Sequence, residues 1–293
     1  MAKAKPEAKS KAKPKAKKAK VEKGSISVST EDIFPIIKRS LYADQDIFLR
    51  ELVSNAVDAI QKLSVLSNRG EYQGEIDELA VRVKLDTEAG TLTVSDNGLG
   101  MTADEVKKYI NQVAFSGAEE FLKKYNDNQD IIGKFGLGFY SAFMVSKEVE
   151  VVSRSYQDGS EAVRWTCDGT TSYTLEAGER EERGTDIILH LDDEAKELYN
   201  TEASIRAILD KYGRFLPIPV YMGEEQINDT APLWRKAPGD LKDEDYLEFF
   251  RKLYPMAEEP LFWIHLNVDS PFQLTGILFF PKIKISFMTQ KRQ

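Results

Sequence analysis

The spacing of apolar residues along the chain predicts one long amphipathic helix near the start of the folded part. From about Asp44 to Leu66, apolar side chains recur every three or four residues, as they do on one face of an α-helix. The residues that share this face are Leu49, Leu52, Val53, Ala56, Ile60 and Leu63. Further helices are expected over about 103–112 and 118–125, from Phe139 onward, and over about 202–212.

Alternation of apolar and polar residues predicts antiparallel strands between these helices. Val81–Leu85 and Thr91–Ser95 both alternate, and the turn-like Glu88–Gly90 joins them into a hairpin. More strands are expected over 149–154, 162–166, 172–176, 185–191 and 216–221. Helices interleaved with hairpins favour an α+β fold, a two-layer α/β sandwich, over a doubly wound parallel sheet.

The composition changes sharply at the beginning of the chain. Residues 1–24 hold ten lysines and two glutamates, a net charge of +8, which leaves −16 for the rest of a chain whose total is −8. Because this segment has almost no large apolar residue, we expect a disordered tail. A tether to nucleic acid, the ribosome or an acidic partner is the alternative. The acidic body argues against a dedicated nucleic-acid binder.

A second change in composition predicts a domain boundary. Residues 223–232 are polar and contain Gly, Asn, Asp and Pro, which is typical of a linker. We therefore expect one domain over 25–222 and a partial α/β segment over 233–293, with a helix near Tyr246–Leu253 and a hairpin over 261–280. Some 60 residues make a poor independent domain, so the segment is expected to be the start of a larger one.

Cysteine, histidine and hydropathy exclude several classes of protein. The single cysteine, Cys167, rules out an internal disulfide, and no cysteine–histidine group has the spacing of a metal site. A structural zinc ion is therefore not expected, and His190 and His265 are assigned structural roles. No apolar run approaches the roughly 20 residues that span a bilayer. These features predict a soluble cytoplasmic protein.

The first candidate group of polar residues lies on the long helix. Glu51, Asn55 and Asp58 fall within an arc of about 60° on the side opposite the apolar stripe. A solvent-exposed helix shows the same stripe, so the spacing alone leaves both interpretations open. The functional one uses a carboxylate as general base and an amide oxygen as a hard ligand for Mg²⁺.

The second candidate group follows a predicted strand directly, at Asp96–Met101. Leu92, Val94 and Asp96 share strand parity, so the carboxylate continues the buried face. A buried Asp needs a hydrogen-bond donor, which an adenine amino group supplies, and Gly98 and Gly100 allow the backbone to approach a flat ring. A strand-terminating Asp-Asn-Gly turn is the alternative interpretation.

The third candidate group is a glycine-rich run before an apolar helix. Gly133, Gly136 and Gly138 precede the segment that begins at Phe139, and exposed N–H groups at a helix start suit a phosphate. The run is not a P-loop, because no Gly-Lys-Ser/Thr follows, and no βαβ unit surrounds it. A flexible glycine hinge is the alternative.

Together, and in this order, the three groups resemble the nucleotide-binding motifs of the GHKL ATPases, with Arg183–Asp186 opening a later strand. The closer resemblance is to the heat-shock protein 90 family, in its bacterial form. It rests on the contiguous runs Leu41–Asp58, Asp96–Met101 and Gly133–Phe143, and extends from about Ser25 to Phe280.

The resemblance implies a Bergerat-type sandwich that binds ATP and Mg²⁺ between its helices and its sheet. Glu51 would orient or activate the attacking water, Asn55 would ligate Mg²⁺, and Asp96 would accept a hydrogen bond from the adenine amino group. The other implied ATP contacts are Asp58 near the ribose, Gly100 and Met101 at the base, Asn111 at the sugar and phosphates, Gly133, Gly136, Gly138 and Phe139 at the phosphates, and Thr185 through water.

Two departures from the family pattern affect the expected activity. Ala114–Ala118 has Phe115 where the family commonly has a basic residue, although Lys134 in the glycine-rich run can replace that phosphate contact. The family's catalytic arginine and dimerisation domain lie beyond Gln293. We therefore expect ATP binding with slow hydrolysis, and no stable dimer from this chain.

The function implied by the resemblance is that of an ATP-dependent chaperone. Its expected partners are unfolded client proteins and co-chaperones, with no membrane contact. Two alternatives remain: another GHKL activity, of the topoisomerase or histidine kinase type, or a non-catalytic nucleotide-binding fragment.

Overall fold

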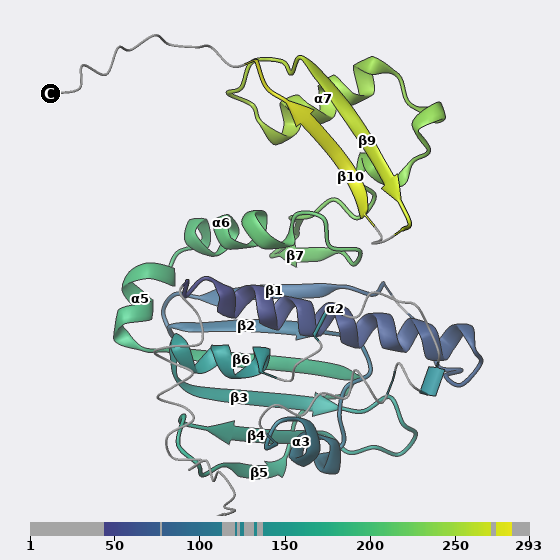
Figure 1. Ribbon diagram of the computed structural model, residues 1–293. Coiled ribbons are helices and arrows are strands. Elements are labelled where there is room, and N and C mark those ends of the chain that lie inside the picture. Colours follow the sequence, from purple (N-terminus) through teal and green to yellow (C-terminus); the bar gives the residue numbers. More distant parts are fainter. Residues whose placement is uncertain are drawn as a thin grey trace, which may run out of the picture.

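The computed structural model describes residues 44–76, 78–112, 121, 124–125, 132–133, 137–270 and 274–282. Within them, the main body is an eight-stranded sheet with the long helix α2 (Ile47–Asn68) on one face, running along the strands (Figure 1). The predicted tail over 1–24 lies outside the described residues. No described helix is both long enough and apolar enough to cross a membrane.

The sheet is mixed and almost entirely antiparallel. Its strands follow the order β5-β4-β3-β6-β2-β1-β7-β8, and among these described strands only the pair β1–β7 is parallel. This arrangement of helices and strands confirms the α+β prediction. The strands are β1 (Val81–Asp86), β2 (Thr91–Asp96), β3 (Ser146–Arg154), β4 (Val163–Cys167), β5 (Thr174–Ala177), β6 (Gly184–Leu191), β7 (Val220–Met222) and β8 (Glu225–Gln226).

The core lies between α2 and one face of this sheet. All six residues predicted to share the apolar face of the helix are buried, as are Leu92 and Val94 of β2 and Leu189 of β6. The alternation predicted for β2 is observed, because its second, fourth and sixth residues are the buried ones. The sixth of these residues is Asp96, so the strand pattern brings a carboxylate to the core face.

Capping side chains define the shorter helices. The helix α3 (Ala103–Tyr109) begins with a capping box between Thr102 and Glu105, and it is shorter than the predicted 103–112. The helix α5 (Asp193–Tyr199) was not predicted, although the Asp192 side chain caps it by accepting a 2.9 Å hydrogen bond from the Ala195 N–H. The helix α6 (Glu202–Gly213) was predicted and is confirmed.

Two predicted elements differ from the observed ones. The helix expected from Phe139 is a seven-residue 3₁₀ helix, η2 (Gly138–Met144), which leads into β3 within two residues. The strand expected over 216–221 is limited to β7, because Pro217 and Pro219 have no N–H group to donate to a neighbouring strand.

A smaller unit follows the sheet (Figure 1). Its helix α7 (Asp243–Leu253) packs on a hairpin of β9 (Phe262–Val268) and β10 (Leu274–Phe280), which confirms both predictions there. Two 3₁₀ turns precede the helix, η3 (Leu233–Arg235) and η4 (Pro238–Asp240). The interval predicted as a linker, 223–232, contains β8 of the large sheet.

Candidate functional site

A cavity of about 1010 Å³ opens between α2 and the covered face of the sheet. It contains side chains or backbone from each of the three candidate groups, although these groups are far apart in the sequence. The predicted site residues that line it are Glu51, Asn55, Asp58, Asp96, Gly100, Met101, Gly133, Gly138, Phe139 and Thr185.

Strand register brings three polar side chains into one row at the cavity. Asp96 at the end of β2 lies opposite Thr185 of β6, and Thr185 lies opposite Ser153 of β3. The hydroxyls of Ser153 and Thr185 are 2.8 Å apart, and the Met101 N–H donates to the Ser153 hydroxyl at 2.8 Å. The row therefore fixes the backbone that follows Asp96.

Asp96 is a carboxylate with few partners of its own. It is 7% exposed, and its Oδ1 accepts a 2.8 Å hydrogen bond from the Gly98 N–H. Burial raises the pKa of Asp96 to about 7, and the charge of Asp186 adds to this rise. Hydrogen bonds from the backbone of Gly98 and Thr185 and the charge of Arg180 only partly oppose it. A ligand that donates a hydrogen bond here would stabilise the ionised form, as expected from the sequence for an adenine amino group.

The glycines after Asp96 are required by packing within the protein. Gly100 has a φ of +59°, and a Cβ there would lie 1.8 Å from the carbonyl oxygen of Arg154. A Cβ on Gly98 would lie 2.5 Å from the carbonyl carbon of Ala59 in α2. Contact with neighbouring backbone already excludes a side chain at both positions. The predicted approach of this backbone to a flat ring remains a prediction.

The polar stripe of α2 faces the cavity and not bulk solvent. Glu51 and Asn55 are half-buried, and Asp58 is 3% exposed. The Glu51 carboxylate is paired with the neighbouring Arg50, whose guanidinium also lies over the ring of Tyr212 at 5.7 Å. The structure therefore favours the functional interpretation of the stripe over that of an exposed helix face.

The glycine-rich run packs directly on this stripe. The Asp58 carboxylate accepts hydrogen bonds from the N–H groups of Ile132 at 2.9 Å and Gly133 at 2.7 Å. A Cβ on Gly133 would lie 2.8 Å from Asn55 Oδ1, and one on Gly138 would lie 2.4 Å from Glu51 Oε2. The backbone of the glycine-rich run therefore approaches the polar atoms of α2 closely, and a side chain at either glycine would have to displace them.

One predicted site residue lies away from the cavity, and two others lie outside the described residues. The Asn111 side chain is absent from the cavity lining, and its Oδ1 accepts a 2.9 Å hydrogen bond from the Trp165 indole. Lys134 and Gly136 lie outside the described residues, as does Phe115. The implied roles of these residues remain predictions.

Two further charged residues belong to the site and were not predicted. Lys62 lines the cavity one helical turn after Asp58; burial lowers its pKa, and the charge of Asp58 partly opposes this. Arg180 forms an ion pair with Asp186 and donates a 2.8 Å hydrogen bond to the Asp96 carbonyl oxygen. The i, i+4 spacing from Asp58 could have indicated Lys62, whereas no local signal indicates Arg180.

The arrangement suits a ligand with a hydrogen-bonding ring at one end and negative charge at the other. At the sheet, Asp96 and Thr185 offer polar atoms that can form hydrogen bonds with a ring. On α2, the side-chain oxygen atoms of Glu51 and Asn55 lie near the glycine backbone, and such oxygen atoms are the ligands that Mg²⁺ prefers. Lys62 adds a half-buried amine to the cavity wall, one helical turn after Asp58.

Comparison with protein families identifies the chain. A family model described as histidine kinase-, DNA gyrase B- and HSP90-like ATPase matches residues 46–197, and a model described as Hsp90 protein matches residues 218–293. This chain belongs to the Hsp90 family. Its main body therefore has the GHKL, or Bergerat, ATPase fold, as the resemblance implied.

Curated relatives place the chain in the bacterial HtpG branch of this family. It is 55% identical over 289 residues to the chaperone protein HtpG of Bacteroides fragilis, covering 93% of this chain and 42% of the relative. The HtpG of Porphyromonas gingivalis is also 55% identical, over 288 residues with the same coverage. That of Desulfitobacterium hafniense is 37% identical over 270 residues, covering 90% of this chain. The chain thus spans less than half the length of these relatives.

Proposed function

We propose that this chain binds Mg-ATP in the cavity between α2 and the sheet, as the nucleotide-binding part of an ATP-dependent chaperone. The observation that carries the proposal is the buried Asp96 carboxylate, which faces a cavity of about 1010 Å³ opposite Glu51 and Asn55. Relatives that cover most of the chain are named as HtpG chaperones, which supports the chaperone role.

In the proposed complex, the residues of the sheet hold the base. Asp96 accepts a hydrogen bond from the adenine amino group, and Thr185 orders a bridging water from its place opposite Asp96. Because the site is buried, these polar contacts count for more than they would in water. Gly100 and Met101 provide backbone at the base, in a position held by the hydrogen bond to Ser153.

The residues of α2 and the glycine-rich run act at the phosphates. Asn55 would hold Mg²⁺, which supplies charge neutralisation to the triphosphate when bound. Gly133, Gly138 and Phe139 line the same end of the cavity and would contact the phosphates. Glu51 would orient the attacking water as general base.

We expect slow hydrolysis from the environment of Glu51 in this structure. The Glu51 carboxylate is paired with Arg50, so this pairing has to loosen before the carboxylate can hold a water. An Arg50→Gln variant would be expected to keep ATP affinity within about threefold while its turnover rises. Turnover by the unmodified chain that equals that of a complete relative would contradict the expectation of slow hydrolysis.

We further propose the wider setting that the family implies. The partners are unfolded or partly folded client proteins and co-chaperones, and the location is the cytoplasm. The boundaries proposed for the chain are an ATP-binding domain over 25–222 and the start of a middle domain over 233–293. The match to the Hsp90 model over 218–293 favours this function over a topoisomerase or histidine kinase activity.

Calorimetric titration with ATP, with and without Mg²⁺, tests the proposal. Asp96→Asn should weaken ATP binding at least 100-fold. The amide oxygen of Asn accepts a hydrogen bond less strongly than a carboxylate does, and its NH₂ group would face the amino group of adenine, which is also a donor. Asp193→Asn, an exposed position in α5, is the matched control and should bind as the unmodified chain does. Absence of binding by the folded unmodified chain, or equal binding by both variants, would contradict a site at Asp96.

A further inference from the structure

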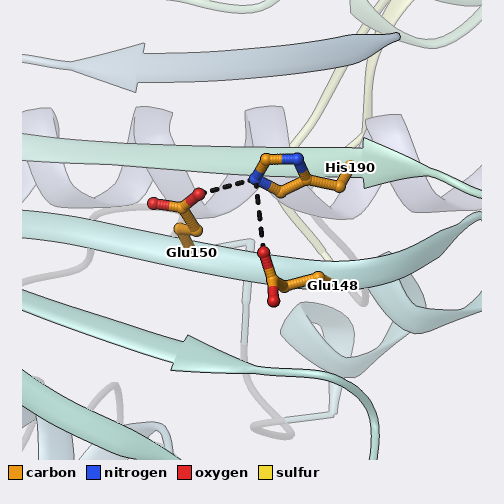
Figure 2. A group of neighbouring side chains, drawn as sticks. All are labelled: Glu148, Glu150 and His190. Atoms are coloured by element: carbon orange, nitrogen blue, oxygen red, sulfur yellow. Dashed lines mark hydrogen bonds and ion pairs between the residues drawn. The ribbon is translucent and has the colours of Figure 1, made fainter. Parts of the chain in front are cut away.

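A compact group of metal-ligating side chains lies away from the nucleotide cavity. Glu148 and Glu150 of β3 and His190 of β6 point toward one another across two adjacent strands (Figure 2). One ligand atom from each residue lies within 4.8 Å of the other two. None of the three residues lines the cavity.

The group is assembled by strand register. Glu148 is paired directly with His190 in the β3–β6 ladder, and Glu150 lies two residues further along β3, on the same face. Side chains of β3 and β6 with the opposite parity, such as Val149, Val151 and Leu189, belong to the core. The three ligands therefore project from the face of the sheet opposite α2, on a rigid scaffold.

The distances are close to those that a tetrahedral metal ion requires. Zinc binds imidazole nitrogen and carboxylate oxygen at about 2.0–2.2 Å, which puts two of its ligand atoms roughly 3.4 Å apart. His190 Nε2 is 3.6 Å from Glu148 Oε1 and 2.6 Å from Glu150 Oε1. The first distance already fits, and the second, now a hydrogen bond, has to lengthen by about 0.8 Å to admit the ion.

We propose that Glu148, Glu150 and His190 form a binding site for a divalent transition-metal ion of the zinc class. One imidazole and two carboxylates suit Zn²⁺, Co²⁺ or Ni²⁺, whereas Mg²⁺ and Ca²⁺ prefer an all-oxygen set. Water completes the coordination, because the side chains of Glu148 and His190 are 42% and 28% exposed.

Arg164 supports one of the ligands from behind. Its Nε donates a 2.8 Å hydrogen bond to Glu150 Oε2, which leaves Oε1 directed at His190. The Glu150 side chain is only 8% exposed, so its orientation is fixed by these partners. A ligating carboxylate held in place by an outer hydrogen bond is a common feature of metal sites.

The proposed site goes beyond ATP binding and can be tested separately from it. Thr185 and Ile187 of β6 line the nucleotide cavity, while His190 has the opposite strand parity. The whole chain contains two histidines and one cysteine, and Cys167 is buried. A transition-metal site with an imidazole ligand must therefore use His190 or His265.

The experiment is a calorimetric titration of the nucleotide-free chain with Zn²⁺, in buffer that contains excess Mg²⁺, beside an NMR spectrum of its two imidazole rings. We expect one saturable site, with a shift of the His190 ring resonances and none for His265. Glu148→Gln and His190→Asn should each weaken Zn²⁺ binding at least tenfold. The exposure of Glu148 makes its variant safe for folding, and circular dichroism checks both.

His265→Asn is the control and should bind Zn²⁺ as the unmodified chain does. Its ring contacts Tyr246 and the Trp234 carbonyl oxygen in the smaller unit, far from β3 in the sequence. No saturable binding in the presence of Mg²⁺ would overturn the proposal and leave a plain ion-paired group. So would binding that survives in both Glu148→Gln and His190→Asn. The ATP affinity of these variants should be unchanged, so a failed metal site and a failed nucleotide site give different results.

Discussion

The two faces of the large sheet each carry a carboxylate that is almost completely buried, and the two behave in opposite ways. Asp96 on the cavity face is 7% exposed, and Glu150 on the other face is 6% exposed. Burial raises the pKa of Asp96 to about 7. Burial acts in the same direction on Glu150, but His190 and Arg164 outweigh it and lower the pKa of that carboxyl below its usual range.

The two carboxylates have similar exposed fractions, but they differ in their partners. Glu150 accepts a hydrogen bond from Arg164 on one oxygen and contacts His190 on the other. Near Asp96, the guanidinium of Arg180 is already engaged by Asp186 and by backbone carbonyls. A buried carboxylate left short of donors is destabilising in the free protein, and a ligand can supply what is missing.

The largest expected effect is on the free energy of unfolding, which Asp96→Asn and Glu150→Gln should change in opposite directions although each removes one carboxylate charge. Asp96→Asn should raise the free energy of unfolding at pH 7.5 by about 1–4 kcal/mol, since each pKa unit corresponds to about 1.4 kcal/mol and the amide still accepts from Gly98. Glu150→Gln should lower it by about 1–3 kcal/mol, because charge-assisted hydrogen bonds are lost. Urea unfolding monitored by circular dichroism measures both.

The pH dependence of these two effects separates them further. The unfolded chain loses the Asp96 proton near the ordinary aspartate pKa of 3.8 and the folded chain near 7, so the stabilisation by Asp96→Asn grows between about pH 4 and pH 7. The contribution of Glu150 is present above the ordinary glutamate pKa of 4.5 and is lost as the pH falls through the lower pKa of the folded state. Equal signs for the two variants at pH 7.5 would contradict the comparison.

A second expected effect concerns nucleotide affinity and pH. If ATP binds only when Asp96 is ionised, its affinity should fall roughly tenfold from pH 8 to pH 6, because the pKa of this carboxyl is about 7 in the free protein. Calorimetry at several pH values measures the affinity. An NMR titration of the Asp96 carboxyl carbon distinguishes its ionisation from that of the phosphates, and a midpoint near 4 would refute the predicted cause.

A smaller loss of ATP affinity is expected when the Thr185 hydroxyl, which lies beside Asp96, is removed. Thr185→Val keeps the shape of the side chain but removes the hydroxyl that lies 2.8 Å from the Ser153 hydroxyl. One lost hydrogen bond, at about 0.5–1.5 kcal/mol, should reduce ATP affinity about three- to tenfold. Thr93→Val on β2, whose side chain has the opposite parity, is the matched control. Equal affinities for the two variants would remove Thr185 from the site.

The smallest effect is expected at the edge of the Glu150 group. Arg164→Gln removes a half-exposed guanidinium from Glu150 and should lower the free energy of unfolding by about 0.5–1 kcal/mol at pH 7. Arg206→Gln breaks the more exposed pair with Glu225 and should cost less. Thermal unfolding measures the loss of stability in both variants. An equal or larger loss for Arg206→Gln would show that the burial of Glu150 does not strengthen its ion pair.

Several parts of the fold and site could be predicted because their signals are local. The apolar spacing of α2 and the alternation in β2 depend only on neighbouring residues, and both predict which side chains are buried. That is why Asp96 could be assigned to the core face, and why Glu51, Asn55 and Asp58 could be grouped. Motif order added the assignment to the Hsp90 family.

Other features depend on contacts between distant segments and had no signal of that kind. The requirement for Gly100 comes from the carbonyl oxygen of Arg154, 54 positions away, and the Asn111 side chain is held by Trp165. By contrast, the strand predicted over 216–221 was too long although Pro217 and Pro219 are a local signal, because the prediction followed only the apolar alternation.

The sequence by itself determined the α+β class, the buried faces of the long helix and the hairpin, and the three segments that line the cavity. Only the tertiary structure decided which carboxylates would be paired. Glu150 and His190 are 40 residues apart, and the register of β3 against β6 brings them to 2.6 Å. The periodicity of apolar residues predicts on which face of a helix or sheet a side chain lies. The pKa of a buried carboxylate depends instead on the charged groups that neighbouring strands bring close to it.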